Sequence, residues 1–162
     1  MAQLKEEFPR LRLLLIGPPA EKSFLSFLKK LIKELRLEER VVFLDYVAEL
    51  YSLLPSLDIL LVPSRQESFG RVIIEAMAVG VPVVAFRQGG VEEIIRDAHN
   101  GCLAEDFSPE ILAEKVKILL HDPFLAAKFI IEGFHTVQSK YNLQEQAQKL
   151  ERLLDQWLVR KS

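Results

Sequence analysis

Short apolar runs alternate with longer stretches of helical periodicity, and this alternation constrains the fold more than any other feature of the chain. The runs occupy residues 12–16, 41–44, 59–62, 82–86 and 102–104. Uninterrupted apolar runs of this length are typical of strands that are buried on both faces of a parallel sheet. Strands that alternate with helices need crossover connections. The sequence therefore predicts an α/β fold: a Rossmann-like parallel sheet with helices on both faces.

The segments between these runs carry the apolar spacing and the end signals of helices. The predicted helices span 21–35, 47–54, 69–79, 91–95, 109–121, 123–141 and 143–160. Pro55 should end the second of these helices, and Gly80 should follow the end of the third. Ser108 should cap the fifth helix, with Pro109 at its first position. The C-terminal part, from about 108 to 160, is thus expected to be helical.

Composition narrows the class of protein. With 162 residues, 49% of them apolar and 27% charged, the chain has the size and composition of one soluble globular domain. The formal net charge of −2 argues against nucleic-acid binding, which usually needs a basic surplus. No apolar window is long enough for a transmembrane segment, and the charged N-terminus lacks the apolar core of a signal peptide.

The cysteine and histidine residues offer little chemistry. Cys102 is the single cysteine, so it excludes an internal disulfide and favours a reducing, cytoplasmic compartment. We interpret it as a small buried apolar residue, because no basic neighbour in the sequence would activate the thiol. His99, His121 and His135 are too scattered to suggest a metal site.

Two glutamates, Glu67 and Glu75, bracket the residues SFGRVII directly after the run at 59–62. Ligands bind at the carboxyl ends of strands in open parallel sheets, and the first N–H groups of the following helix can bind a diphosphate. Gly70 would let the backbone approach it closely. Glu75 could accept hydrogen bonds from ribose hydroxyls, and Glu67 from a sugar. Alternatively, both carboxylates only balance the positive end of the helix dipole.

This stretch resembles the donor motif of the group 1 (family 4) retaining glycosyltransferases, which have the two-domain GT-B architecture. The motif is a glutamate, seven residues and a second glutamate, here Glu67 to Glu75. The resemblance spans roughly residues 10 to 145, and its other blocks are LLLIG at 13–17, VVFLDYV at 41–47, VPS at 62–64, AMA at 76–78, GVPV at 80–83, Gly89-Gly90 and EII at 93–95.

The resemblance implies a role for each matching position. Glu67 should hold the transferred sugar at the catalytic centre, and Glu75 should hold the ribose. The remaining donor-binding positions are the backbone N–H groups of Phe69, Gly70 and Arg71 on sugar or phosphate, Gly17 and Pro18 along the nucleotide cleft, and the loop of Leu44, Asp45, Tyr46 and Val47 beside the base. The Arg71 side chain either adds charge near the phosphates or is simply solvated.

The implied activity is transfer of a hexose from a UDP-, GDP- or ADP-sugar to an acceptor hydroxyl, with no cofactor or metal. Residues 1–162 would form a single nucleotide-sugar-binding domain, cytoplasmic or peripheral at a membrane in a full-length enzyme. In the family, this domain begins one strand–helix unit earlier, with a glycine–arginine pair and a lysine, and follows an N-terminal acceptor domain. We therefore expect the isolated chain to be inactive.

Several alternatives stay open. The absent strand could come from a partner chain, from the N-terminal residues, or be replaced by repacking. The chain could be a non-catalytic nucleotide- or sugar-binding module, an inactive truncated fragment or, less favoured, part of a nucleotide-sugar epimerase. We interpret the apolar residues around Trp157 on the last helix as part of a packed core. If this apolar face were left uncovered, it would promote self-association.

Overall fold

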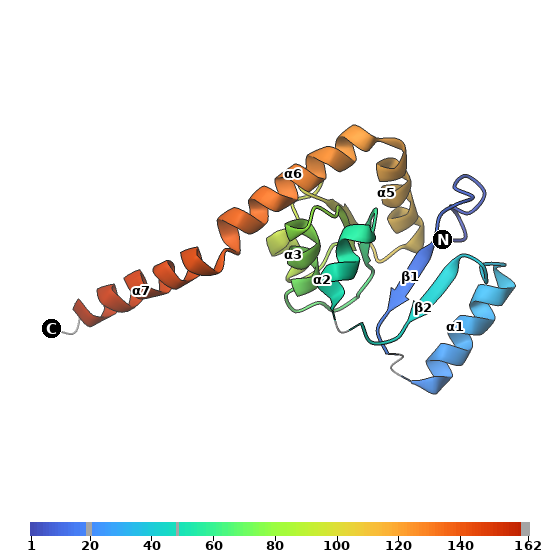
Figure 1. Ribbon diagram of the computed structural model, residues 1–162, viewed down its shortest axis with the longest axis horizontal. Coiled ribbons are helices and arrows are strands. Elements are labelled where there is room, and N and C mark those ends of the chain that lie inside the picture. The colour runs from blue at the N-terminus through green and yellow to red at the C-terminus, as the bar shows by residue number, and fades with distance from the viewer. Residues whose placement is uncertain (19–20, 48, 160–162) are drawn as a thin grey trace. The chain divides into compact units, whose positions relative to one another are not determined.

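A computed structural model describes residues 1–18, 21–47 and 49–159 (Figure 1). The chain divides into two compact units, Met1–Leu50 and Tyr51–Ser162. All strand pairing is parallel, in a two-stranded sheet β1-β2 in the first unit and a three-stranded sheet β3-β4-β5 in the second. The predicted parallel α/β architecture is confirmed, with the strands hydrogen-bonded in two separate sheets.

The first unit contains β1 (Leu13–Ile16), α1 (Lys22–Glu34) and β2 (Val41–Leu44). Its small core consists of the buried residues Ile32, Leu37 and Val41, against which partly buried side chains of β1 and α1 pack. Residues 2–7, 9 and 10 form turns, and the Nζ atom of Lys5 donates a hydrogen bond to the Leu35 carbonyl at 2.8 Å. The N-terminal residues therefore form turns in this unit and add no strand to its sheet.

The second unit contains the remaining elements. They are α2 (Leu50–Leu53, which begins at the unit boundary), the 3-10 turn η1 (Leu54–Ser56), β3 (Leu60–Val62), α3 (Arg71–Ala78), β4 (Val83–Phe86), α4 (Val91–Ile94), β5 (Cys102–Ala104), α5 (Pro109–His121), α6 (Pro123–Lys140) and α7 (Leu143–Val159). In the sheet, Leu61 lies opposite Val84, and Ala85 lies opposite Leu103.

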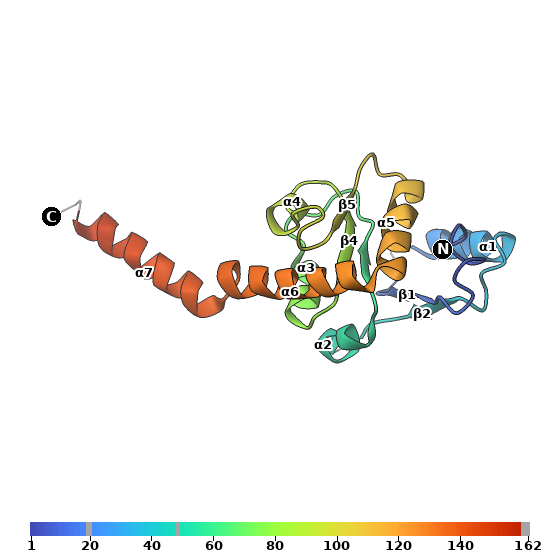
Figure 2. The same ribbon diagram turned by 90° about the horizontal axis from the view of Figure 1, so that it is seen from above.

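Helices cover both faces of this three-stranded sheet. Helix α3 packs on β3 and β4, α5 packs on β4 and β5, and Figure 2 shows β4 and β5 between these two helices. Every residue of β4 and β5 is buried, as expected for uninterrupted apolar runs in a parallel sheet. Cys102 is one of them, which confirms its interpretation as a small buried apolar residue, and burial raises the pKa of its thiol to about 11.

The predicted end signals act as expected. Ser108 accepts a hydrogen bond from the N–H of Ile111 at 3.3 Å, and Asp122 accepts one from the N–H of Leu125 at 2.9 Å. At the end of α3, the N–H groups of Gly80 and Val81 donate back to carbonyls of the last turn of the helix. This is the Schellman arrangement, which satisfies carbonyl groups that the helix leaves without partners.

One helix boundary was predicted wrongly. The expected helix over 47–54 begins only at Leu50 as α2. It ends at Leu53, before Pro55 as predicted, and Pro55 lies in the turn η1 that follows. Proline has a fixed backbone φ angle and lacks only an N–H, so the first turn of a new helical segment accommodates it. The predicted end of the last helix, Arg160, lies outside the described residues.

The last helix differs from its expected role. Leu150, Leu153, Leu154 and Trp157 are each more than half exposed, so this stripe on α7 is not packed in a core, contrary to the prediction. The helix nevertheless begins as predicted, with the side chain of Asn142 accepting a hydrogen bond from the N–H of Gln144 at 2.9 Å. Among the described residues, no helix combines the length and apolar character that crossing a bilayer requires.

Candidate functional site

Glu67, the first of the two predicted glutamates, lies in the loop between β3 and α3, close to the start of that helix. Gly70 precedes the first residue of α3 and has a left-handed backbone conformation, with φ of 82°. A Cβ atom there would approach the Cδ1 atom of Ile73 to 2.9 Å. Both conditions favour glycine, so the backbone N–H groups at this helix start are not covered by a side chain of residue 70.

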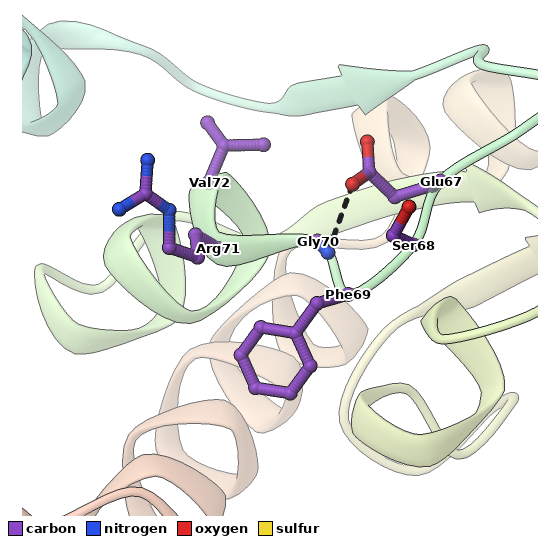
Figure 3. A pocket seen from close by; sticks show the side chains of 6 residues that line it. All are labelled: Glu67, Ser68, Phe69, Gly70, Arg71 and Val72. Atoms are coloured by element: carbon purple, nitrogen blue, oxygen red, sulfur yellow. Dashed lines mark hydrogen bonds between the residues drawn. The ribbon is translucent and has the colours of Figure 1, made fainter.

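Glu67 folds back onto this helix start. Its Oε1 atom accepts a hydrogen bond from the N–H of Gly70 at 3.0 Å, and Figure 3 shows the second carboxylate oxygen turned away from that bond. A carboxylate is favoured here because the helix dipole places partial positive charge at its N-terminus. Glu67 therefore closes the turn that leads into the helix and keeps an oxygen with further acceptor capacity.

A hollow of about 410 Å³ opens at this position (Figure 3). It is lined by Glu67, Ser68, Phe69, Gly70, Arg71 and Val72. The structure thus brings Glu67 together with the three predicted backbone positions, Phe69, Gly70 and Arg71. Arg71 is the only basic residue among the described residues that line the hollow, and Glu75 is not part of its lining.

Glu75 lies farther along α3, where a tyrosine contacts it. The hydroxyl of Tyr51, on α2, donates a hydrogen bond to the Oε1 atom of Glu75 at 3.1 Å. This hydrogen bond is the main reason that the pKa of Tyr51 is raised, because loss of the phenolic proton would put two negative charges in contact. Tyr51 was missed by sequence reasoning, since no local spacing connects it with a residue 24 positions away.

A turn after β4 supports the loop that carries Glu67. A Cβ atom on Gly90 would lie 2.4 Å from the carbonyl oxygen of Ser68, so the two backbones touch. The side chain of Gln88, which sequence reasoning also missed, makes hydrogen bonds with this loop. The Gly89-Gly90 pair in the sequence could have indicated a close backbone approach, but not which segment it meets.

The aromatic ring of Phe69 is anchored on the opposite side. It packs edge-to-face against Tyr141, with the ring centroids 6.0 Å apart, and Figure 3 shows this ring pointing away from the Glu67 carboxylate. Tyr141 in turn donates a hydrogen bond to the carbonyl of Glu93 at 3.3 Å, and burial raises the pKa of its hydroxyl. The predicted role of Phe69 thus involves its backbone, while its side chain fixes the loop.

The predicted site residues of the first unit also form a group. Gly17 and Pro18 follow β1, the segment of Leu44, Asp45, Tyr46 and Val47 includes the end of β2, and the N–H of Gly17 donates to the Leu44 carbonyl at 3.0 Å. These residues therefore share the carboxyl edge of one two-stranded sheet. Their predicted contacts with a nucleotide stay predictions. Within the part of the chain that the structure describes, no cluster of His, Cys, Asp and Glu could hold a metal ion.

Comparison with known proteins adds independent evidence. Residues 1–136 match the family model for glycosyl transferases group 1. An N-acetyl-alpha-D-glucosaminyl L-malate synthase of Bacillus anthracis is 40% identical over 68% of the chain, and a D-inositol 3-phosphate glycosyltransferase of Corynebacterium efficiens is 37% identical over 75% of it. The matched regions make up 28% and 30% of these two relatives' lengths.

Solved structures of similar proteins share the fold. The HepE protein of Anabaena, solved with UDP, is 28% identical over 91% of this chain and 42% of that protein, with a TM-score of 0.86. The C-terminal domain of LpcC from Francisella tularensis, a glycosyl transferase group 1 family protein, is 31% identical over 88% of this chain and 75% of that domain, with a TM-score of 0.80. The family model covers most of the sequence, and the chain therefore belongs to the group 1 glycosyltransferases.

Proposed function

We propose that the chain is the donor-binding domain of a retaining glycosyltransferase that transfers a hexose from a nucleoside diphosphate sugar to an acceptor hydroxyl. The observation that carries this proposal is the hollow at the start of α3, where Glu67, the Gly70 backbone and Arg71 come together. The acceptor would be held by a separate N-terminal domain of the complete enzyme, and no metal or cofactor is implied.

The chemistry follows from the helix start. Its N–H groups and partial positive charge would hold the diphosphate and stabilise the charge that develops on it as the leaving group. The outward oxygen of Glu67 would accept hydrogen bonds from hydroxyls of the sugar. A donor phosphate or sugar oxygen could also compete with Glu67 for the Gly70 N–H. The second oxygen of Glu67 would bind the sugar, so this role is compatible with the hydrogen bond that its Oε1 atom accepts from the Gly70 N–H.

Glu75 would hold the ribose with Tyr51 beside it. An ionised carboxylate has about four acceptor positions, and the Tyr51 hydroxyl occupies one of them. The others remain for the two ribose hydroxyls. In the first unit, Gly17, Pro18 and the residues Leu44 to Val47 would contact the nucleotide from the carboxyl edge of β1 and β2.

The relatives support a nucleotide-sugar donor. The HepE protein of Anabaena has been solved with UDP, with UDP and glucose, and with UDP-glucose. The Bacillus anthracis relative is named for an N-acetylglucosaminyl group, which is a hexose derivative. The free buried thiol of Cys102 is consistent with the reducing conditions of a cytoplasm.

The proposal is tested by calorimetric titration of the chain with UDP-glucose, UDP-N-acetylglucosamine, GDP-mannose and ADP-glucose. At least one should bind, and Glu75→Gln should weaken that binding about tenfold, the loss expected for hydrogen bonds to a charged group. Glu114→Gln, on the exposed face of α5 in the same unit, is the matched control and should leave affinity unchanged. Absence of binding, or equal affinity in Glu75→Gln, would contradict the assignment.

A second candidate function is binding without transfer by the isolated chain. Arg71 is the only basic residue among those described around the hollow, whereas a departing diphosphate needs more positive charge for stabilisation. We expect the purified chain to show no sugar transfer and at most trace hydrolysis of the donor. A radiolabelled-donor assay with simple acceptor sugars tests this, and sustained turnover would exclude the binding-only function.

A further inference from the structure

We propose that Gln88 is a positioning residue for Glu67, and that it tunes how well the site recognises the sugar of the donor. This inference rests on the proposed function of the hollow at the start of α3. It concerns a residue on a different element, the turn after β4, which does not line that hollow. Gln88 would act through the backbone of Glu67 and would not contact the donor.

The side-chain amide of Gln88 clamps both ends of a short loop segment. Its Nε2 atom donates a hydrogen bond to the carbonyl of Ser64 at 3.2 Å, and its Oε1 atom accepts one from the N–H of Glu67 at 3.1 Å. Only one orientation of the amide satisfies both partners, because a carbonyl cannot donate and an N–H cannot accept. The two bonds therefore fix the backbone on either side of residues 65 and 66.

These bonds continue into the helix start. Gln88 holds the backbone N–H of Glu67, and the Glu67 carboxylate in turn accepts from the N–H of Gly70 at 3.0 Å. Ser64, Gln88, Glu67 and Gly70 thus form one connected hydrogen-bond path. A loop held at both ends loses less conformational entropy when a ligand binds, which is the basis of preorganisation.

Contacts on both sides of Gln88 hold the turn from which its side chain extends. The preceding residue, Arg87, donates from Nε to Glu105 at 2.5 Å and pairs with Glu92 at 3.1 Å. On the other side of Gln88, the backbone of Gly90 lies so close to Ser68 that a Cβ atom would clash. The turn at 87–90 is therefore held on both sides of Gln88, and the Gln88 side chain connects this turn to the loop by hydrogen bonds.

If Gln88 positions Glu67, its substitution should weaken recognition of the sugar more than recognition of the nucleoside diphosphate. The ratio between the Kd of a nucleoside diphosphate and the Kd of its sugar conjugate measures recognition of the sugar. Gln88→Met keeps the length of the side chain and removes both hydrogen bonds, so this ratio should fall about fivefold as the Glu67 carboxylate loses its fixed orientation. Gln66→Met, an exposed glutamine of the same loop, is the matched control and should leave the ratio unchanged.

The experiment pairs titration with amide hydrogen exchange measured by NMR. In Gln88→Met, exchange at the Glu67 amide should accelerate about tenfold, whereas the Leu103 amide, bonded to Asp97 at 2.8 Å, should keep its rate. Gln88→Glu retains an oxygen acceptor for the Glu67 N–H, so it should keep most of the protection and of the selectivity. Equal losses in the Met and Glu variants would overturn the role of that acceptor.

The outcomes separate this inference from the proposed function. If the wild-type chain prefers a sugar conjugate and Gln88→Met retains the full preference, Gln88 has no positioning role while donor binding stands. A uniform loss of affinity for diphosphate and conjugate, with faster exchange at Leu103 as well, would show a purely structural role and overturn the inference. If the wild-type chain binds none of the four donors, the proposed function and this inference both fail.

Discussion

The two sheets of the molecule are built from equally apolar strands but are buried to different extents. In the second unit every residue of β4 and β5 is buried, whereas in the first unit Ile16, Val42 and Phe43 are 38%, 41% and 38% exposed. The three-stranded sheet has helices on both faces, and the core of the two-stranded sheet contains few fully buried side chains. An apolar run thus predicts a strand, while its burial depends on the elements that cover it.

The candidate site residues differ in the same way. In the second unit, hydrogen bonds hold the carboxylates of both candidate site glutamates. Glu67 accepts from the Gly70 N–H, and Glu75 accepts from the Tyr51 hydroxyl. In the first unit a backbone hydrogen bond joins Gly17 to Leu44, and Tyr46 is 80% exposed. The second unit therefore presents a preorganised site, and the first unit presents loops whose order would depend more on a ligand.

The largest expected effect is a loss of stability on truncating a buried phenylalanine, and it tests how well the cores of the two units are packed. Phe129→Ala, at a side chain 1% exposed on α6, should lower the free energy of unfolding of the second unit by about 3–5 kcal/mol. Phe43→Ala, on the half-covered strand β2, should cost the first unit only about 1–2 kcal/mol because much of the ring already contacts water. Urea unfolding followed by circular dichroism measures both.

Phe124→Ala supplies the control for the same substitution. This side chain is 87% exposed on α6, and its removal should change the free energy of unfolding by less than about 0.5 kcal/mol. Equal costs for Phe129 and Phe43 would break the comparison, because they would mean that the first unit has a core as well packed as that of the second.

A pair of glycine substitutions compares the two regions at their site loops. Gly90→Ala should destabilise the second unit by about 1–3 kcal/mol, since the new Cβ atom would lie 2.4 Å from the Ser68 carbonyl oxygen. A Cβ atom on Gly17 would have no described atom within 4 Å beyond its chain neighbours, so Gly17→Ala should cost only the strain of a φ angle of 122°, about 1–3 kcal/mol. Thermal melting gives the cost of each.

The two substitutions should also differ in where they act. In amide NMR spectra, Gly90→Ala should shift the signals of Ser68 and Phe69, because the backbones touch at that point. Gly17→Ala should shift signals near β1. An unshifted Ser68 in Gly90→Ala would show that the turn at 87–90 does not support the loop.

Much of the fold could be predicted because its signals are local. The apolar runs predicted the five strands of the described residues, and Ser108 and Gly80 marked helix ends that the structure confirms. Helix α2 ends before Pro55 as predicted, but it begins at Leu50, later than the apolar spacing indicated. The exposed stripe on α7 failed because periodicity shows that a helix face is apolar, but not what covers it.

The site was predictable only in part, for a related reason. The spacing of Glu67 and Glu75 located the helix start, since both glutamates are close to it in the sequence. The partners Tyr51 and Gln88 are 24 and 21 residues away from the glutamates that they contact. The fold brings such residues together, and no residue-type pattern in the chain marks them in advance.

The smallest expected effect concerns the tyrosine that contacts Glu75. Tyr51→Phe removes a hydroxyl that donates to the carboxylate at 3.1 Å, so affinity for a bound nucleotide sugar should fall about two- to fivefold as Glu75 loses its fixed orientation. Glu114→Gln, on the exposed face of α5, is again the control and should leave affinity unchanged. Calorimetric titration near neutral pH measures both, and an unchanged affinity in Tyr51→Phe would mean that the hydroxyl does not orient Glu75.

The same hydrogen bond predicts a pH dependence. Glu75 raises the pKa of Tyr51 above its ordinary value of 10.0, so the folded chain holds this proton more tightly than the unfolded chain does. The stabilisation is therefore fully present below the ordinary value and is lost as the pH rises through the higher folded value. In a spectrophotometric titration of the phenolate absorbance, Glu75→Gln should move one tyrosine to a lower pKa. A titration identical to that of the wild type would show that Tyr51 and Glu75 are not in contact in solution.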